Sequence, residues 1–216
     1  LTHAPTAVTS APLPTSAAPP ATHTVQPPPT SEGTVPVPPA PEPAIDGSGN
    51  GNPAAPQFNI DYETSEPSVA ITSTESSPTN ADPIPVAINF SESVTGFTIA
   101  DIAVTNGTLN TFSGSGASYT VNVAPTSDGT VTVNVAADAA IDVSGNGNTA
   151  APQFNIDYDS SGPSVAITSA LSPGPTGTSP IPVTFTFSEA VTGFLVGDIT
   201  VGNGAAGNFV PVSGTV

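Results

Sequence analysis

The sequence contains neither lysine nor arginine, against 17 aspartate and glutamate residues, so its formal net charge is -17 over 216 residues. A chain without cationic side chains cannot neutralise phosphates, which argues against nucleic acid as a partner. The same lack argues against an anionic membrane surface and against arginine-based recognition of phosphate or carboxylate substrates. The excess of carboxylates favours solubility through mutual repulsion, and it offers oxygen ligands to hard cations such as Ca²⁺.

Cysteine, methionine and tryptophan are absent as well. Without cysteine there is no disulfide framework, no thiolate nucleophile and no cysteine-ligated metal. No stretch approaches the ~20 consecutive apolar residues that cross a bilayer, so we expect no membrane insertion by these residues. The N-terminus has neither the basic nor the apolar region of a signal peptide. We expect any export signal or membrane anchor to lie outside these 216 residues.

The strongest positive signal is internal repetition. The segment 44–62 (AIDGSGNGNPAAPQFNIDY) recurs at 140–158 as AIDVSGNGNTAAPQFNIDY, about 96 residues later, and similarity at a fixed spacing marks repeat proteins. It continues from DPIPVAINFSESVTGF to SPIPVTFTFSEAVTGF, one residue further apart because of an insertion near 173–178. We therefore expect the end of one repeat at 44–62, a complete repeat at 63–158 and a truncated repeat at 159–216.

The proline-rich segment 1–43 also follows the repeat. TVQPPPTSEGTVPV aligns without a gap on TVNVAPTSDGTVTV of the complete copy. Its prolines remove backbone N–H donors where strands should run, and His23 stands where the complete copy has Tyr119. We therefore expect 1–43 to be a degraded repeat half that is extended or disordered.

Apolar residues occupy every second position along much of the complete repeat, which is the period of a half-buried strand. The longest such runs are 84–90, 119–123, 131–135 and 154–158. Asn-Gly and Asp-Gly pairs at 106–107 and 128–129 predict turns between strands, and no segment has a helical period with caps. About seven short strands in ~96 residues predict an all-β, immunoglobulin-like Greek-key sandwich.

The segments FSESVTGF, YTVNVAPTSDGTVTVNV and AIDVSGNGN resemble a family of bacterial Ig-like domains that occur in tandem in large surface and secreted proteins. The resemblance covers nearly the whole chain. It implies a non-catalytic stalk or adhesin role at the bacterial surface or outside the cell. It also implies neighbouring repeats as partners, with surface glycans or host ligands bound through domains that this chain does not contain. The alternative is an accessory carbohydrate-binding module of a secreted enzyme, which the scarcity of aromatic residues disfavours.

The loop DVSGNGN spaces oxygen-bearing side chains at alternate positions, like the first half of an EF-hand calcium loop. These residues are Asp142, Ser144, Asn146 and Asn148, and their counterparts one repeat earlier are Asp46, Ser48, Asn50 and Asn52. Asp157 and Asp159 follow at the junction with the next repeat, where a shared Ca²⁺ ion would stiffen the array. The twelfth loop position holds Gln153 in place of the usual bidentate glutamate. The alternative is therefore a polar turn with Asx-type hydrogen bonds, and we expect no cofactor other than this calcium.

Two glutamates, Glu92 and Glu189, each precede an aspartate by nine residues. Paired carboxylates are the machinery of glycoside hydrolases, but here every repeat would carry the same site, which argues against catalysis. Both histidines lie in the degraded segment, so no Ser/His/Asp triad can be assembled. We predict that the chain is not an enzyme.

The second repeat stops partway through the pattern. Residues 163–216 lack about three of the seven strands, so we expect them to expose a sheet edge and half of a core. Strand donation from another copy, including its residues 56–62, is one way in which they would be covered.

Overall fold

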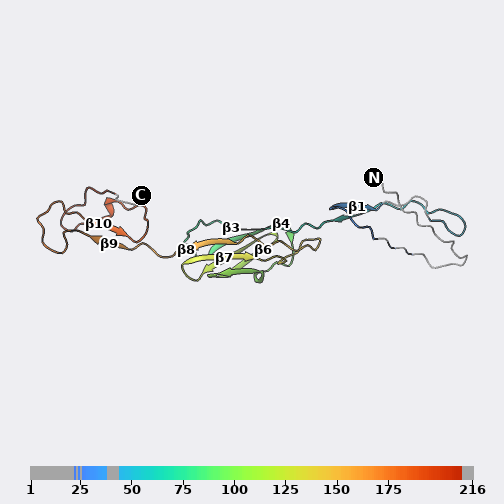
Figure 1. The fold of residues 1–216 in the computed structure, drawn as a ribbon, viewed down its shortest axis with the longest axis horizontal. Helices are drawn as coiled ribbons and strands as arrows, with labels where there is room; N and C mark the ends of the chain where they lie inside the picture. The colour runs from blue at the N-terminus through green and yellow to red at the C-terminus, as the bar shows by residue number, and fades with distance from the viewer. Residues whose placement is uncertain (1–21, 23, 25, 38–43, 211–216) are drawn as a thin grey trace.

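The computed structural model describes residues 22, 24, 26–37 and 44–210, and nearly all their regular structure is β-strand (Figure 1). The described residues contain two short 3-10 turns, η1 (Ile99–Asp101) and η2 (Val196–Asp198). Within these residues, no helix has the length and apolar character needed to span a membrane. The strands form three groups that follow one another in chain order along the longest axis of the molecule.

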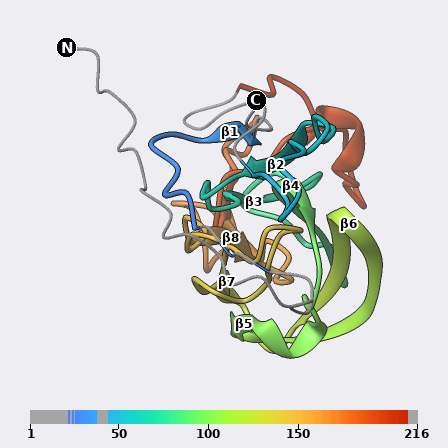
Figure 2. The same ribbon diagram turned by 90° about the vertical axis from the view of Figure 1, so that its right-hand side faces the viewer.

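The central group is a sandwich of two antiparallel sheets. One sheet has the order β3 (Val69–Ser73), β4 (Ile84–Val94) and β6 (Gly107–Pro125). The other has the order β5 (Ile102–Thr105), β7 (Gly129–Val135) and β8 (Phe154–Tyr158). Figure 2 shows this group from the end. The predicted all-β immunoglobulin-like sandwich is confirmed.

Strand β6 is 19 residues long and folds back on itself. A Cβ placed on Gly107 would lie 2.7 Å from Cγ1 of Val123, and one placed on Gly114 would lie 2.4 Å from the carbonyl oxygen of Ser118. Gly114 also has a φ of 129°, which residues with a side chain rarely adopt. With its two halves counted separately, the sandwich has seven strands.

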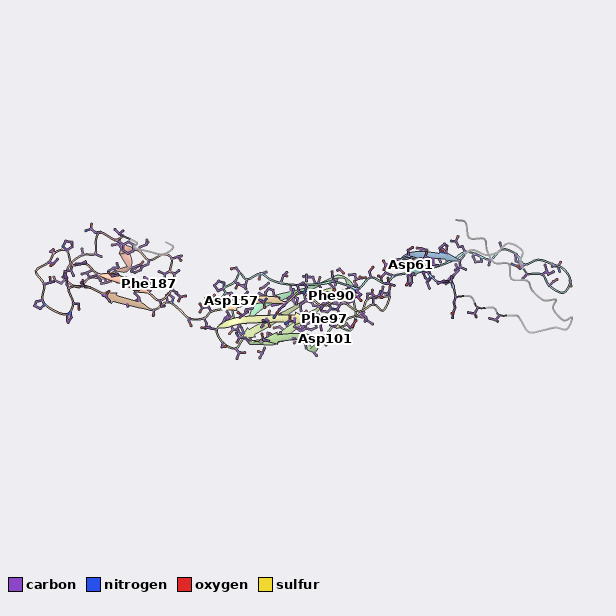
Figure 3. All side chains as sticks on the ribbon, viewed as in Figure 1. Asp61, Phe90, Phe97, Asp101, Asp157 and Phe187 are labelled. Atoms are coloured by element: carbon purple, nitrogen blue, oxygen red, sulfur yellow. The ribbon has the colours of Figure 1, made fainter. Side chains whose placement is uncertain are left out.

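The alternating apolar residues form the core between the sheets. Ile84 and Ile88 of β4 are fully buried, and so are Val131 and Val133 of β7 in the other sheet. Toward one end, aromatic rings replace the disulfide and tryptophan of antibody domains, and Figure 3 labels two of them. These rings, joined by centroid distances of 5.0–5.9 Å, belong to Phe90, Phe97, Phe112 and Tyr119.

The N-terminal group pairs β1 (Gly33–Val37) with β2 (Phe58–Tyr62). Gly33 lies opposite Tyr62, just as Gly129 lies opposite Tyr158 in the pair β7 and β8. Gly33–Val37 is thus extended, which is one of the two states predicted for 1–43. Pro36 is tolerated because β1 pairs with β2 alone in the described part of the chain, so an N–H is not needed along its other edge. Residues 1–21, 23, 25 and 38–43 lie outside the described residues.

The C-terminal group pairs β9 (Val165–Thr168) with β10 (Thr184–Phe187), the repeat counterparts of β3 and β4. Four phenylalanines, two of them in β10, cluster at this pair: Phe185, Phe187, Phe194 and Phe209. No residue in 159–210 is buried. Val165, for example, is 49% exposed, whereas its counterpart Val69 is 5% exposed. This group therefore exposes half of a core, as the sequence predicts.

Candidate functional site

The loop that begins at Asp142 is a closed turn. The Asp142 carboxylate accepts the backbone N–H groups of Ser144 and Asn146 at Oδ1, each at 2.8 Å, and the Asn146 side-chain amide at Oδ2, at 3.0 Å. Burial acts to raise the pKa of Asp142, but the hydrogen bonds from Asn146 and Ser144 outweigh it, so the pKa lies below its ordinary value. The carboxylate thus works as the Asx-type cap that the sequence offers as the alternative to calcium.

Asn148 ties the two ends of this loop together from inside. The residue is 1% exposed. Its Oδ1 accepts the N–H of Ala140 at 2.8 Å, and its Nδ2 donates to the carbonyl oxygens of Ala136 and Thr149 at 2.9 and 2.8 Å. This satisfied amide has a structural role, because buried polar groups destabilise a fold unless they are paired.

The earlier copy of the loop repeats this geometry without a core beneath it. Asp46 accepts the N–H groups of Ser48 and Asn50 at 2.8 and 2.9 Å and the Asn50 side-chain amide at 2.9 Å. These hydrogen bonds, the one from the Asn50 side chain foremost, lower the pKa of Asp46. The turn therefore depends on its local sequence and not on burial.

Asp157 and Asp159 lie at the other end of the sandwich. The Asp157 carboxylate accepts the hydroxyl of Thr130 at 2.6 Å, and that of Asp159 accepts the N–H of Ser161 at 3.0 Å. Figure 3 labels Asp157 at the end next to the C-terminal group. The structure therefore splits the predicted calcium ligands between two places. Over the described ranges, no three or more acidic or histidine side chains are grouped so that they could hold a metal ion.

Two acidic residues, Glu63 and Asp142, share the side-chain amide of Asn146 where the N-terminal group joins the sandwich. Asn146 Nδ2 donates to Oε2 of Glu63 at 2.8 Å, which places the Asp142 loop at this junction. Loss of hydration, followed by the charges of Asp142 and Glu63, raises the pKa of Glu92. The glutamate of the FSE segment therefore faces like charges.

The aspartate that follows Glu92 by nine residues, Asp101, caps a turn. The Asp101 carboxylate accepts both the N–H and the hydroxyl of Thr98 at 2.8 Å and so caps η1. Asp198 accepts the N–H of Leu195 at 2.8 Å at the same repeat position. Each aspartate shapes a turn of its own domain.

The sequence pattern of the bacterial Ig-like domain matches residues 63–158 and 159–216. The chain belongs to this family. Searches of curated proteins and of solved structures give no match. The matched stretches are consecutive, so the chain carries Ig-like domains in tandem. The contacts between one domain and the next are a second candidate site.

At the end of the complete Ig-like domain, Asp128 binds the first residues of the next one. Its carboxylate accepts the N–H and the hydroxyl of Ser160 at 2.8 and 2.7 Å and the hydroxyl of Ser161 at 2.6 Å. These hydrogen bonds, that of the Ser161 side chain first, lower the pKa of Asp128. A carboxylate in the turn before β7 thus holds the start of the following domain.

The same contact exists one repeat earlier, where Glu32 precedes β1. Its carboxylate accepts the N–H and hydroxyl of Thr64 at 3.1 and 2.6 Å and the hydroxyl of Ser65 at 3.0 Å, and its pKa is lowered by these bonds, that of Thr64 foremost. We call the two contacts the junction clamps. Sequence reasoning missed them, although the signal was present: both clamp acids share one repeat position, and both hydroxyl pairs share another.

Proposed function

We propose that this chain is a non-catalytic spacer in an extracellular or cell-surface bacterial protein of the stalk or adhesin type. Its Ig-like domains would set the distance at which another domain is held. The observation that carries the proposal is the repeated junction clamp, in which Glu32 and Asp128 bind the start of the next domain in the same way. A repeated contact fixes a repeated geometry, which is what a spacer needs.

The arrangement of the aromatic residues supports a spacer over a carbohydrate-binding module. Phe90, Phe97 and Tyr119 are at most 6% exposed inside the complete domain. A sugar platform needs exposed rings on which a pyranose can stack. The carboxylates that would serve in hydrolysis are used in turns or face like charges.

The location can be tested with an antibody raised against the 216-residue chain. We expect the antibody to label intact cells of the source bacterium, or its culture supernatant, without permeabilisation. Labelling only after lysis would contradict the proposal. Retention of the chain on polysaccharide resins, when an unrelated acidic protein is not retained, would favour the binding module instead.

Calcium stiffening is the finer part of the proposal, and it would act at the junctions between domains. Glu63 and Asp142 both accept the side-chain amide of Asn146 at the first junction, and the chain has no lysine or arginine to neutralise them. Asp157 and Asp159 are the repeat counterparts of Asp61 and Glu63, so they would serve the following junction. A divalent cation would relieve the like-charge repulsion at each place.

We expect Ca²⁺ to raise the melting temperature of the chain, and Glu92→Gln to reduce that gain. Calorimetry in Ca²⁺ and in EDTA measures both effects. The Ca²⁺ concentration should reach several-fold above the dissociation constants of extracellular modules, which are about 10⁻⁴–10⁻³ M. Glu189→Gln is the matched control, because it changes the same repeat position on an exposed part of the second domain. The absence of binding heat, together with equal melting temperatures in Ca²⁺ and EDTA, would refute calcium stiffening and leave the spacer proposal standing.

A further inference from the structure

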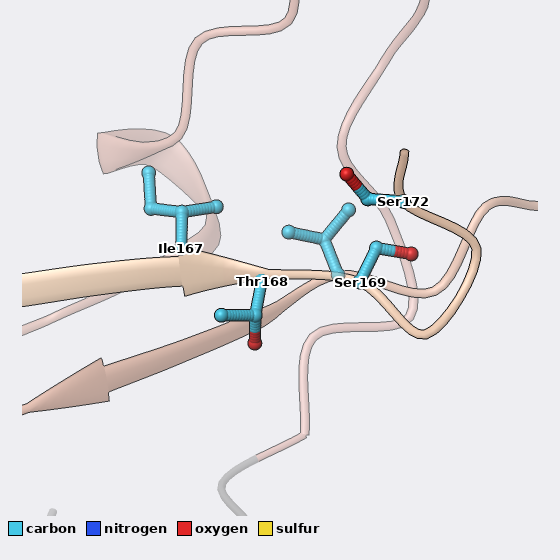
Figure 4. Close-up of a pocket in the computed structure, with 5 residues that line it drawn as sticks. Ile167, Thr168, Ser169 and Ser172 are labelled. Atoms are coloured by element: carbon cyan, nitrogen blue, oxygen red, sulfur yellow. The ribbon is translucent and has the colours of Figure 1, made fainter. Parts of the chain in front are cut away.

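Few groups in this chain react on their own, since cysteine and lysine are absent. Figure 4 shows a hollow beside β9 that is lined in part by hydroxyl residues, but its Ser169 Oγ accepts the N–H of Leu171 at 3.2 Å and so serves a turn. Asparagine followed directly by glycine is more reactive, because glycine has no Cβ to hinder attack of its nitrogen on the asparagine side chain. Four asparagines stand in such pairs: Asn50, Asn106, Asn146 and Asn203.

The pair Asn146-Gly147 lies at the first junction. Asn146 Nδ2 is 2.8 Å from Oε2 of Glu63 and 3.0 Å from Oδ2 of Asp142. An ionised carboxylate only accepts hydrogen bonds, so both contacts exist because residue 146 has an amide with N–H groups to donate. One NH₂ group therefore joins the loop to the start of the domain.

The surroundings of this pair leave it open to reaction. Gly147 pairs with Ile141, but the two hydrogen bonds of this bridge are donated by the residues that follow each of them. The N–H of Gly147 therefore stands outside the bridge, and the half-buried Asn146 side chain can be reached by water. Asn148 shows the contrast within the same loop, because it is 1% exposed, makes three hydrogen bonds and precedes a β-branched residue.

We propose that Asn146-Gly147 is a site of spontaneous deamidation, which opens the first junction with time. The Gly147 nitrogen loses its proton and bonds to Cγ of Asn146, the bond from Cγ to Nδ2 breaks, and Nδ2 leaves as ammonia. Water then opens the cyclic imide at either carbonyl group, which gives aspartate or isoaspartate. Water is the only co-reactant. This goes beyond the proposed spacer function, which concerns the junction before any modification.

The product reverses the character of the contact. A carboxylate at position 146 has no hydrogen to donate, so three acceptors would face one another where one donor now joins two. The chain has no lysine or arginine to offset the added charge. The charges of Asp142 and Glu63 already contribute to the raised pKa of Glu92. A modification that adds a charge beside like charges disrupts a contact through repulsion.

Mass spectrometry of elastase peptides identifies the residue that changes when the full chain is incubated at neutral pH. We expect aspartate and isoaspartate to accumulate at Asn146, while Asn148 in the same loop remains an amide. Asn146→Gln should stay unmodified over the same time, because its longer side chain would have to close a larger ring. If Asn146 kept its amide for as long as Asn148 does, the proposal would be overturned.

A second measurement follows the junction itself. Dyes at Ala54→Cys and Thr74→Cys, both at exposed positions, report the distance across it by single-molecule energy transfer. EDTA in every sample prevents Ca²⁺ from offsetting the added charge. Asn146→Asp, which copies the product, should broaden the narrow distance distribution of the parent. Asn50→Asp is the matched control, because it adds the same charge to the earlier copy of the turn, where the amide bonds Asp46 and not Glu63.

A double variant separates the junction from damage to the fold. Glu63→Gln added to Asn146→Asp supplies a donor again, now from residue 63 to residue 146, and should narrow the distribution. Asn50→Asp should leave the distribution as it is in the parent. An Asn146→Asp distribution as narrow as that of the parent, or a double variant as broad as the single one, would show that the amide does not hold the junction and would overturn the proposal.

Discussion

At the scale of single residues, one motif has two environments in the same chain. The segment around SGNGN forms the same Asx turn at Asp46 and at Asp142, with hydrogen bonds of 2.8–3.0 Å in both. Only the second copy has a core beneath it. The local sequence therefore determines the turn, and the surrounding domain determines how much stability its buried groups contribute.

Asn148→Ala should destabilise the complete domain far more than Asn52→Ala destabilises its own loop. The first substitution leaves the Ala140 N–H and two carbonyl groups without partners in a buried place, and each such group costs about 1–3 kcal/mol. Asn52 makes the same kind of bond to Ala44 at a half-exposed position. We expect less than about 0.5 kcal/mol there, as for other surface changes. Equal losses in denaturant unfolding would contradict this assignment.

The calcium motif shows what residue patterns leave open. Alternating oxygen side chains at 142–148 predict either a cation site or a capped turn, because both need oxygen atoms at that spacing. In the structure, Oδ1 of Asp142 accepts two backbone N–H groups, as a capped turn requires. The meeting of Glu63 with Asn146, 83 residues apart, depends on the tertiary fold and has no local pattern.

At the scale of strands, the period of two was sufficient to locate the core. The apolar positions of β4 and β7 are buried where the alternation places them. Proline content left the state of Gly33–Val37 open between extended and disordered, because pairing depends on the partner as well as on the strand. Strand β2 retains the intact sequence FNIDY, and its Asp61 accepts the hydroxyl of Thr34 at 2.6 Å, as Asp157 does with Thr130.

A substitution at the same repeat position should change the free energy of unfolding very differently in the two Ig-like domains. Ile84→Ala removes a fully buried side chain from β4 and should cost about 2–5 kcal/mol. Ile181→Ala changes the counterpart, which is 56% exposed, and should leave the main unfolding transition within about 0.5 kcal/mol. Chemical denaturation of the full chain at low concentration measures both. A similar loss for Ile181→Ala would mean that the second domain has a closed core.

At the scale of the whole molecule, the proposed spacer function would depend on the junction clamps. Each clamp acid has a lowered pKa because hydroxyl and N–H groups donate to its ionised form. Because the pKa is lowered, each clamp carboxylate stabilises its junction fully above the ordinary carboxyl pKa of about 4. This stabilisation is lost as the pH falls through the lower pKa of the folded chain. The junctions should therefore be ordered at neutral pH and loosen in acid.

Asp128→Ala should loosen the junction between the two Ig-like domains at neutral pH. Because the chain has no cysteine, Thr74→Cys and Thr176→Cys would place one dye on each domain at exposed positions. Single-molecule energy transfer between the dyes, on highly dilute chains, measures the distribution of distances between the two domains. We expect a narrow distance distribution for the parent chain at pH 7 and a broader one for Asp128→Ala.

Acid provides the second arm of the same measurement. Below about pH 4 the parent distribution should broaden toward that of Asp128→Ala, because protonation removes the acceptor that the variant already lacks. The variant itself should change little with pH. Asp82→Ala, which removes one charge from an exposed position that shares no hydrogen bond with the clamp residues, should behave as the parent does at both pH values. If Asp128→Ala and Asp82→Ala gave the same narrow distribution at pH 7, the clamp would have no part in holding the domains at a fixed spacing.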